Sequence, residues 1–158
     1  MKLMKCLPVF LAASLMGMTT YADDLIVTGF TGVSGTIDGD LIVEDGGIAL
    51  LDNALVKGNV EVEPGGRLSS FDTNTSTIEG NVEAEAALFF VLNFDCVFGD
   101  VEVKNAGGLV AVVNSLVGGN VEFEENDASA VLVGSATQGN VVVGDVQLSK
   151  KGAVALSS

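Results

Sequence analysis

Apolar and polar residues alternate in short runs along most of this chain. In the segment Val60–Glu63, valines occupy every second position and glutamates stand between them. This is the period of a half-buried β-strand whose valines lie on the inner face. No segment after residue 22 has a sustained helical period, so we predict a chain that is almost entirely β-structure.

The alternating segment belongs to a sequence motif that recurs at a nearly constant interval. Each copy has a glycine, then Asn or Asp, then the apolar residue that begins a strand. The copies are Ile37–Glu44, Val56–Glu63, Ile78–Glu85, Val97–Lys104, Val117–Glu124 and Thr137–Gly144. Their glycines, at positions 39, 58, 80, 99, 119 and 139, are separated by 19, 22, 19, 20 and 20 residues. A period near twenty is typical of repeat architectures in which each copy forms one coil.

A single coil of this kind cannot fold by itself. About four or five buried Val, Ile or Leu side chains contribute roughly 1.5–3 kcal/mol each. Ordering the backbone of about twenty residues costs roughly 20–40 kcal/mol. Each coil therefore needs neighbours, and we predict an all-β fold, a single-stranded, right-handed parallel β-helix of about six coils of 19–22 residues. The variable coil length favours the right-handed form over the left-handed one.

The repeat region 37–144 resembles two groups of β-solenoid proteins on the basis of its Gly-[Asn/Asp]-Val steps. One group is the β-helix repeats of secreted filamentous adhesins. The other is the bactofilins, which are bacterial polymer-forming solenoids. The resemblance implies a structural rather than a catalytic role. Bactofilins are cytoplasmic as a family, and the beginning of this chain departs from that pattern.

The first residues have the pattern of a secretory signal peptide. Lys2 and Lys5 precede an apolar run at Leu7–Met18, and small residues follow it. We therefore predict a signal peptide at 1–22, a β-solenoid domain at 23–158, and export of the mature protein. No later apolar stretch approaches the length of a membrane-spanning helix, so we expect no transmembrane segment in the mature chain.

The charge of the chain is strongly negative. It has 21 acidic and 7 basic residues, a formal net charge of −14. Such a surface repels nucleic acid and anionic membranes and attracts cations or basic partners. We predict no nucleic-acid partner.

The composition also argues against an enzyme. The chain has no His and no Trp, and its single Tyr, Tyr21, lies in the predicted signal peptide. Nucleophile pairs that depend on His are therefore excluded. We predict no catalytic residues and no cofactor; the alternative is bound Ca²⁺. The enzyme alternative is a polysaccharide-lyase-like β-helix, for which Lys57 and Arg67 are the only basic residues near the loop at 72–76.

Stacked coils would align carboxylates in outward columns. The first column contains Glu61, Glu83, Glu102 and Glu122, which are the candidate metal ligands. A second column contains Glu44, Glu63, Glu85 and Glu124 and is interrupted by Lys104. Carboxylates about 4.8 Å apart repel each other, which would favour a bound cation such as Ca²⁺. The alternative is a solvated face that keeps a β-rich protein soluble.

The polar residue after each glycine predicts a third column. Its members are Asp40, Asn59, Asn81, Asp100, Asn120 and Asn140. We expect a structural ladder at one corner, in which each side-chain amide bonds to the same amide of the next coil.

One coil is unusually aromatic. The candidate interface residues are Phe89, Phe90, Phe94 and Phe98. Adjacent side chains of a strand point to opposite faces, so either one ring faces outward and marks a dimer seam, or a wider coil encloses the rings. Cys96 lies beside them, and we expect it to be a small buried residue or else a site of intermolecular pairing.

These observations favour an exported, non-catalytic β-solenoid with a structural, adhesive or self-associating role. Its homo-oligomer or polymer would form through the solenoid ends or through the Phe-rich coil. The alternatives are a Ca²⁺-binding surface protein and the polysaccharide-lyase-like enzyme.

Overall fold

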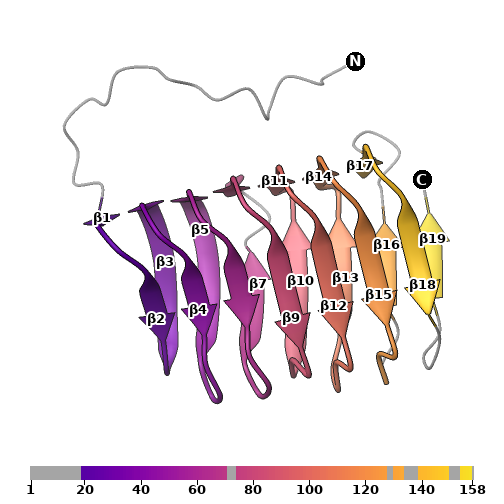
Figure 1. The fold of residues 1–158 in the computed structure, drawn as a ribbon, viewed down its shortest axis with the longest axis horizontal. Helices are drawn as coiled ribbons and strands as arrows, with labels where there is room; N and C mark the ends of the chain where they lie inside the picture. The colour runs from indigo at the N-terminus through magenta and orange to yellow at the C-terminus, as the bar shows by residue number, and fades with distance from the viewer. Residues whose placement is uncertain (1–18, 71–73, 128–129, 134–138, 150–153, 158) are drawn as a thin grey trace.

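A computed structural model describes residues 19–70, 74–127, 130–133, 139–149 and 154–157. Its strands stack side by side along one axis, from the N-terminal end in indigo to the C-terminal end in yellow (Figure 1). All strand pairs are parallel, and the strands form a β-solenoid of about five turns, close to the expected six. The described residues contain no helix, which confirms the prediction of an all-β parallel solenoid. Its right-handed sense stays a prediction.

The seven-stranded sheet is the first of three columns of strands. Its members are β2 (Leu25–Val27), β4 (Leu41–Val43), β6 (Val60–Val62), β9 (Val82–Glu85), β12 (Val101–Lys104), β15 (Val121–Glu124) and β18 (Val146–Ser149). This column contains the Val-Glu alternation that the sequence repeats most clearly.

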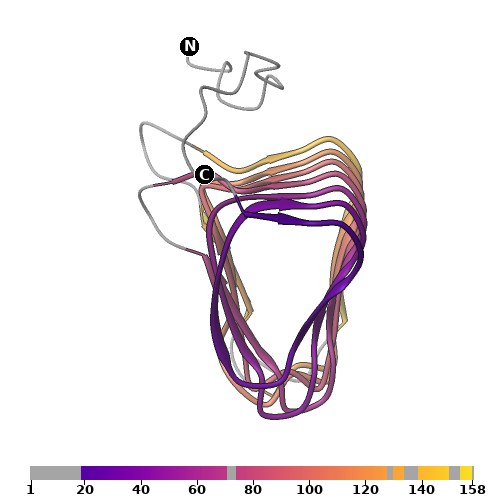
Figure 2. The same cartoon turned by 90° about the vertical axis from the view of Figure 1, so that its left-hand side faces the viewer.

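The second and third columns form the twelve-stranded sheet. The second column contains β7 (Arg67–Ser70), β10 (Phe89–Asn93), β13 (Val110–Val113), β16 (Ala130–Val133) and β19 (Val154–Ser157). The third contains β1 (Thr20–Tyr21), β8 (Thr77–Ile78), β11 (Cys96–Val97), β14 (Leu116–Val117) and β17 (Val141–Val142). Two long strands, β3 (Phe30–Ile37) and β5 (Ile48–Val56), run through both columns. Viewed along the axis, the coils superimpose around a common interior (Figure 2).

Inward positions of successive coils fill that interior. Val60, Val82, Val101 and Val121 lie in register in the first column and each is 0% exposed. Phe90 and Phe123 are the largest fully buried side chains among the described residues. These buried columns of side chains form the core of the solenoid. Each coil needs its neighbours because they complete this core.

Single residues in the left-handed region make the sharp corners. Ala86, Asn105 and Glu125 lie between the first and second columns, with φ angles of 47° to 52°. Asn53 and Phe94 have φ angles of 55° and 62° at the corner between the second and third columns. One such residue redirects the chain without a hairpin, so consecutive strands belong to different columns.

The third corner requires glycine because successive coils approach closely there. A Cβ atom on Gly99 would lie 2.7 Å from the carbonyl oxygen of Gly80 and would clash with the side chain of Asn81. The recurring glycine at this corner is thus a packing requirement rather than a turn preference.

The structure corrects the register of the last repeat. We expected Gly139 to continue the glycine column, but a Cβ atom there meets nothing within 4 Å, whereas Gly144 packs against Gly119. Val133 and Val141 are separated by 141 − 133 = 8 positions, whereas their partners Val113 and Leu116 are separated by 116 − 113 = 3. The last coil therefore contains five extra residues between β16 and β17.

Two predictions concern the beginning of the chain. Thr20–Tyr21, inside the predicted signal peptide, form β1 and pair with Thr36–Ile37 of β3. Residues 1–18 lie outside the described part, and the boundary at residue 22 stays a prediction. The described ranges contain no helix with the length and apolar character that a membrane crossing requires.

Candidate functional site

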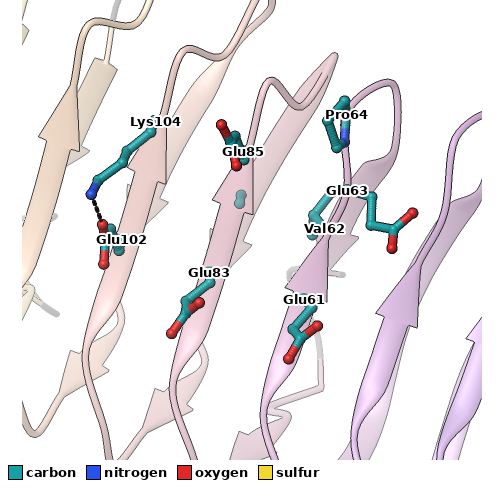
Figure 3. Close-up of a pocket in the computed structure, with 9 residues that line it drawn as sticks. Glu61, Val62, Glu63, Pro64, Glu83, Glu85, Glu102 and Lys104 are labelled. Atoms are coloured by element: carbon teal, nitrogen blue, oxygen red, sulfur yellow. Dashed lines mark ion pairs between the residues drawn. The ribbon is translucent and has the colours of Figure 1, made fainter.

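The predicted acidic column lies on the outer face of the first column of strands (Figure 3). Parallel pairing places Glu61 beside Glu83, Glu83 beside Glu102, and Glu102 beside Glu122. Three of them, Glu61, Glu83 and Glu102, line a hollow of about 440 Å³ together with Glu63, Glu85 and Lys104 of the second acidic column. The alignment of the candidate metal ligands therefore agrees with the sequence analysis.

Lys104 partly neutralises this face. Its ammonium group forms ion pairs with Glu102 and, at 3.4 Å, with Glu124. Hydrogen bonding to Glu102 is the main cause that raises the pKa of Lys104. In the part of the chain that the structure describes, no group of three or more acidic, His or Cys side chains is placed to hold a metal ion.

The column of Asn and Asp residues forms a hydrogen-bonded ladder, which we call the surface ladder. Its rungs are Asp24, Asp40, Asn59, Asn81, Asp100, Asn120 and Asp145. Each backbone N–H donates to the side-chain oxygen of the preceding rung, at distances of 2.6 to 3.0 Å. The predicted amide-to-amide bonds are therefore replaced by bonds from the main chain, which Asp accepts as well as Asn.

Asn140 is not a member of the surface ladder, contrary to expectation. Asp145 takes its place, because the five extra residues shift the last copy of the motif to Gly144-Asp145-Val146. That segment matches the repeated motif as well as Gly139-Asn140-Val141 does, so the sequence was also compatible with the register found in the structure.

A second ladder, which the sequence pattern does not predict, lies at the corner between the second and third columns. We call it the buried ladder. It runs from Ala54 through Ser76, Asp95 and Ser115 to Asn140. Here each backbone N–H donates to the side-chain oxygen of the following coil, at 2.7 to 3.2 Å. Its mixed residue types share only an acceptor oxygen, so no sequence pattern marks it.

Asp95 is the one carboxylate of the buried ladder. It is 1% exposed, and its two oxygens accept hydrogen bonds from the N–H groups of Ser76 and Asn93, each at 3.0 Å. Burial raises the pKa of Asp95 to about 6, although the hydrogen bonds with Ser70, Ser76 and Asn93 act in the opposite direction. Desolvation of the charged form is the dominant cause.

The four candidate interface rings do not share one environment. Phe90 is 0% exposed, Phe98 is 42% exposed, and Phe89 and Phe94 are half-buried. Phe89 belongs to β10, Phe94 forms the corner before β11, and Phe98 follows β11. Cys96 is 1% exposed, as expected for a small buried residue, and is not a free thiol in the structure.

The C-terminal coil exposes residues that belong to the core register. Val146 pairs with Val121, and Leu148 pairs with Phe123. Val121 and Phe123 are 0% and 1% exposed, but Val146 and Leu148 are 39% and 38% exposed. Apolar side chains at inward positions are thus accessible at this end of the solenoid.

Comparison of the chain with protein-family models, with curated proteins and with solved structures gives no match. The resemblance to filamentous adhesins and bactofilins is therefore supported only at the level of the parallel β-solenoid fold.

Proposed function

We propose that this protein is an exported, non-catalytic structural solenoid that self-associates through its C-terminal end. The exposure of Val146 and Leu148 in the core register carries the proposal. Unpaired edge strands with accessible apolar residues are templates for further pairing, and burial of these side chains would stabilise an assembly. Export is inferred from the leader pattern at 1–22.

The Phe-rich coil is the competing association surface. Phe98 is exposed, and Leu88 and Leu109, which are 46% and 45% exposed, lie on neighbouring coils. These residues have outward or corner positions, whereas Val146 and Leu148 have positions that are buried in β4, β6, β9, β12 and β15. Binding of a second copy would therefore be stabilised more by burial of apolar side chains at the C-terminal end than at the Phe-rich coil.

Sedimentation equilibrium of the full chain over roughly 1–100 µM tests the proposal. We expect concentration-dependent oligomers, and Leu148→Lys should weaken association by at least about tenfold because it places a charge in the apolar contact. Phe98→Lys is the matched control and should leave association unchanged. A monomer at every concentration, or loss of association in Phe98→Lys alone, contradicts the proposal.

The Ca²⁺-binding alternative can be separated in the same experiment. It predicts that Ca²⁺, compared with EDTA, raises the melting temperature or promotes association, and that Glu83→Gln reduces the effect. The self-association proposal predicts the same behaviour in both buffers.

A further inference from the structure

We propose that the solenoids join head to tail, with β18 of one copy pairing in parallel with β2 of a second copy. This inference rests on the proposed function and adds the polarity and register of the joint. β2 and β18 are the two end strands of the seven-stranded sheet. Each therefore has one edge that no other described strand of the sheet covers.

The register follows from the repeat itself. Inward residues begin with Leu25 and Val27 in β2 and end with Val146 and Leu148 in β18. Continuing the same pairing by one coil places Val146 beside Leu25 and Leu148 beside Val27 of the next copy. The joint then repeats the contact that already holds β15 to β18.

The charges at the two ends fit this joint. The outward column is occupied by Glu61, Glu83, Glu102 and Glu122 in the central coils. At its N-terminal end the same column has Ile26 and Ile42, and at its C-terminal end it has Gln147. The joint would therefore place Gln147 beside Ile26, so the repulsion within this outward column stops short of both ends. The two carboxylates that the joint brings together are those of Asp24 and Asp145 in the surface ladder, where Asp24 and Asp40 are already neighbouring rungs.

The surface ladder continues across the same joint. Asp24 is its first rung and Asp145 its last, and each central rung accepts an N–H from the rung that follows. In the predicted register, the N–H of Asp24 in the second copy donates to the Asp145 side chain of the first. The rung requires only an acceptor oxygen, which both Asp and Asn supply in the central coils.

Tail-to-tail pairing would reproduce neither the parallel register nor the continuation of the surface ladder. Two β18 strands related by a two-fold axis would be antiparallel and would place side chains of the two ladders at opposite ends of the contact. Only the head-to-tail arrangement repeats the parallel pairing of every described coil.

Cysteine cross-linking of the full chain tests polarity and register. One variant carries Gln147→Cys and the other Ile26→Cys; both positions are exposed. Mixed and oxidised, they should give a disulfide-linked heterodimer, because neighbouring in-register residues lie within disulfide reach. Glu122→Cys mixed with Ile26→Cys is the matched control, since two coil steps, roughly 9.6 Å, exceed that reach.

We expect at least about a tenfold higher cross-linking yield for the Gln147–Ile26 mixture than for the control. Preferential homodimers of Gln147→Cys would show tail-to-tail association and would overturn the inference while leaving self-association intact. Absence of oligomers in sedimentation would instead remove the proposed function itself.

The ladder rung has its own test. Asp145→Ala should weaken association about five- to tenfold, because the N–H of Asp24 loses its acceptor. Asp145→Asn keeps that oxygen and should associate like the wild type. Equal weakening by both variants, or by neither, overturns the placement of Asp24 against Asp145.

Discussion

The central coils and the C-terminal coil use the same register but differ in burial. Phe123 and Leu148 are paired neighbours in the first column, yet they are 1% and 38% exposed. The difference arises because Phe123 has a coil on each side, whereas Leu148 has a described neighbour on only one side. At the C-terminal end, residue type and strand position therefore do not decide how far a side chain is buried. The N-terminal end differs, because Val27 in the end strand β2 is only 1% exposed.

Truncation of core residues should show the largest contrast. Phe123→Ala leaves a cavity between two coils and should lower the free energy of unfolding by about 3–5 kcal/mol. Leu148→Ala should lower it by only about 1 kcal/mol or less at concentrations where the protein is monomeric. Urea unfolding followed by circular dichroism measures both values. Val121→Ala and Val146→Ala provide a pair of identical substitutions in the same column, and equal effects in that pair would contradict the comparison.

The buried carboxylate should give the next largest effect, as a dependence of stability on pH. The pKa of Asp95 is about 6 in the folded chain and 3.8 for an ordinary Asp. Between these values the folded state binds more protons than the unfolded state, so stability rises as the pH falls from about 6 to about 4. The contribution is about 3 kcal/mol at most.

Asp95→Ser tests this dependence because Ser76 and Ser115 occupy the same position in neighbouring coils. Unfolding measured from pH 4 to pH 7 should vary less in this variant than in the wild type. Asn140→Ser, at the end of the same ladder, should keep the wild-type pH profile and controls for the remaining acidic residues. Identical profiles for all three proteins would exclude Asp95 as the source.

Glycine substitution should distinguish central from terminal corners. Gly99→Ala forces a Cβ atom against the backbone of Gly80 and should cost about 1–3 kcal/mol. Gly139→Ala has open space around it and should change stability by less than about 0.5 kcal/mol. Thermal unfolding measures the pair, and a larger loss for Gly139→Ala would contradict the corrected register of the last coil.

The smallest contrast concerns the surface ladder. Asn81→Ala removes the acceptor for the N–H of Asp100, which lies 3.0 Å away, and should cost about 1 kcal/mol because water can replace it in part. Asp145→Ala removes a rung with no described coil after it and should leave the stability of the monomer unchanged. Chemical denaturation below the association range measures both variants, and equal losses would contradict the assignment of Asp145 as the last rung.

Several features of the candidate site followed from local pattern alone. The alternation in Val60–Glu63 identified the inward valines, and the nearly constant step between copies aligned the outward glutamates. Both predictions succeed because a parallel stack repeats the same residue position at every coil. The buried ladder was not predictable in this way, since Ser76, Asp95 and Asn140 share an acceptor oxygen but no residue type.

The sequence by itself determined that the chain coils, which residues face inward, and where carboxylates line the surface, because these properties depend on periods shorter than one coil or equal to it. Only the tertiary structure decided that Gly144 rather than Gly139 belongs to the glycine column, because the pairing of β17 with β14 places the extra residues before that corner. It also decided that Asp95 is buried and that Leu148 is exposed. Burial depends on which coil lies next to a residue, and that neighbour is set by packing across about twenty residues rather than by the local sequence.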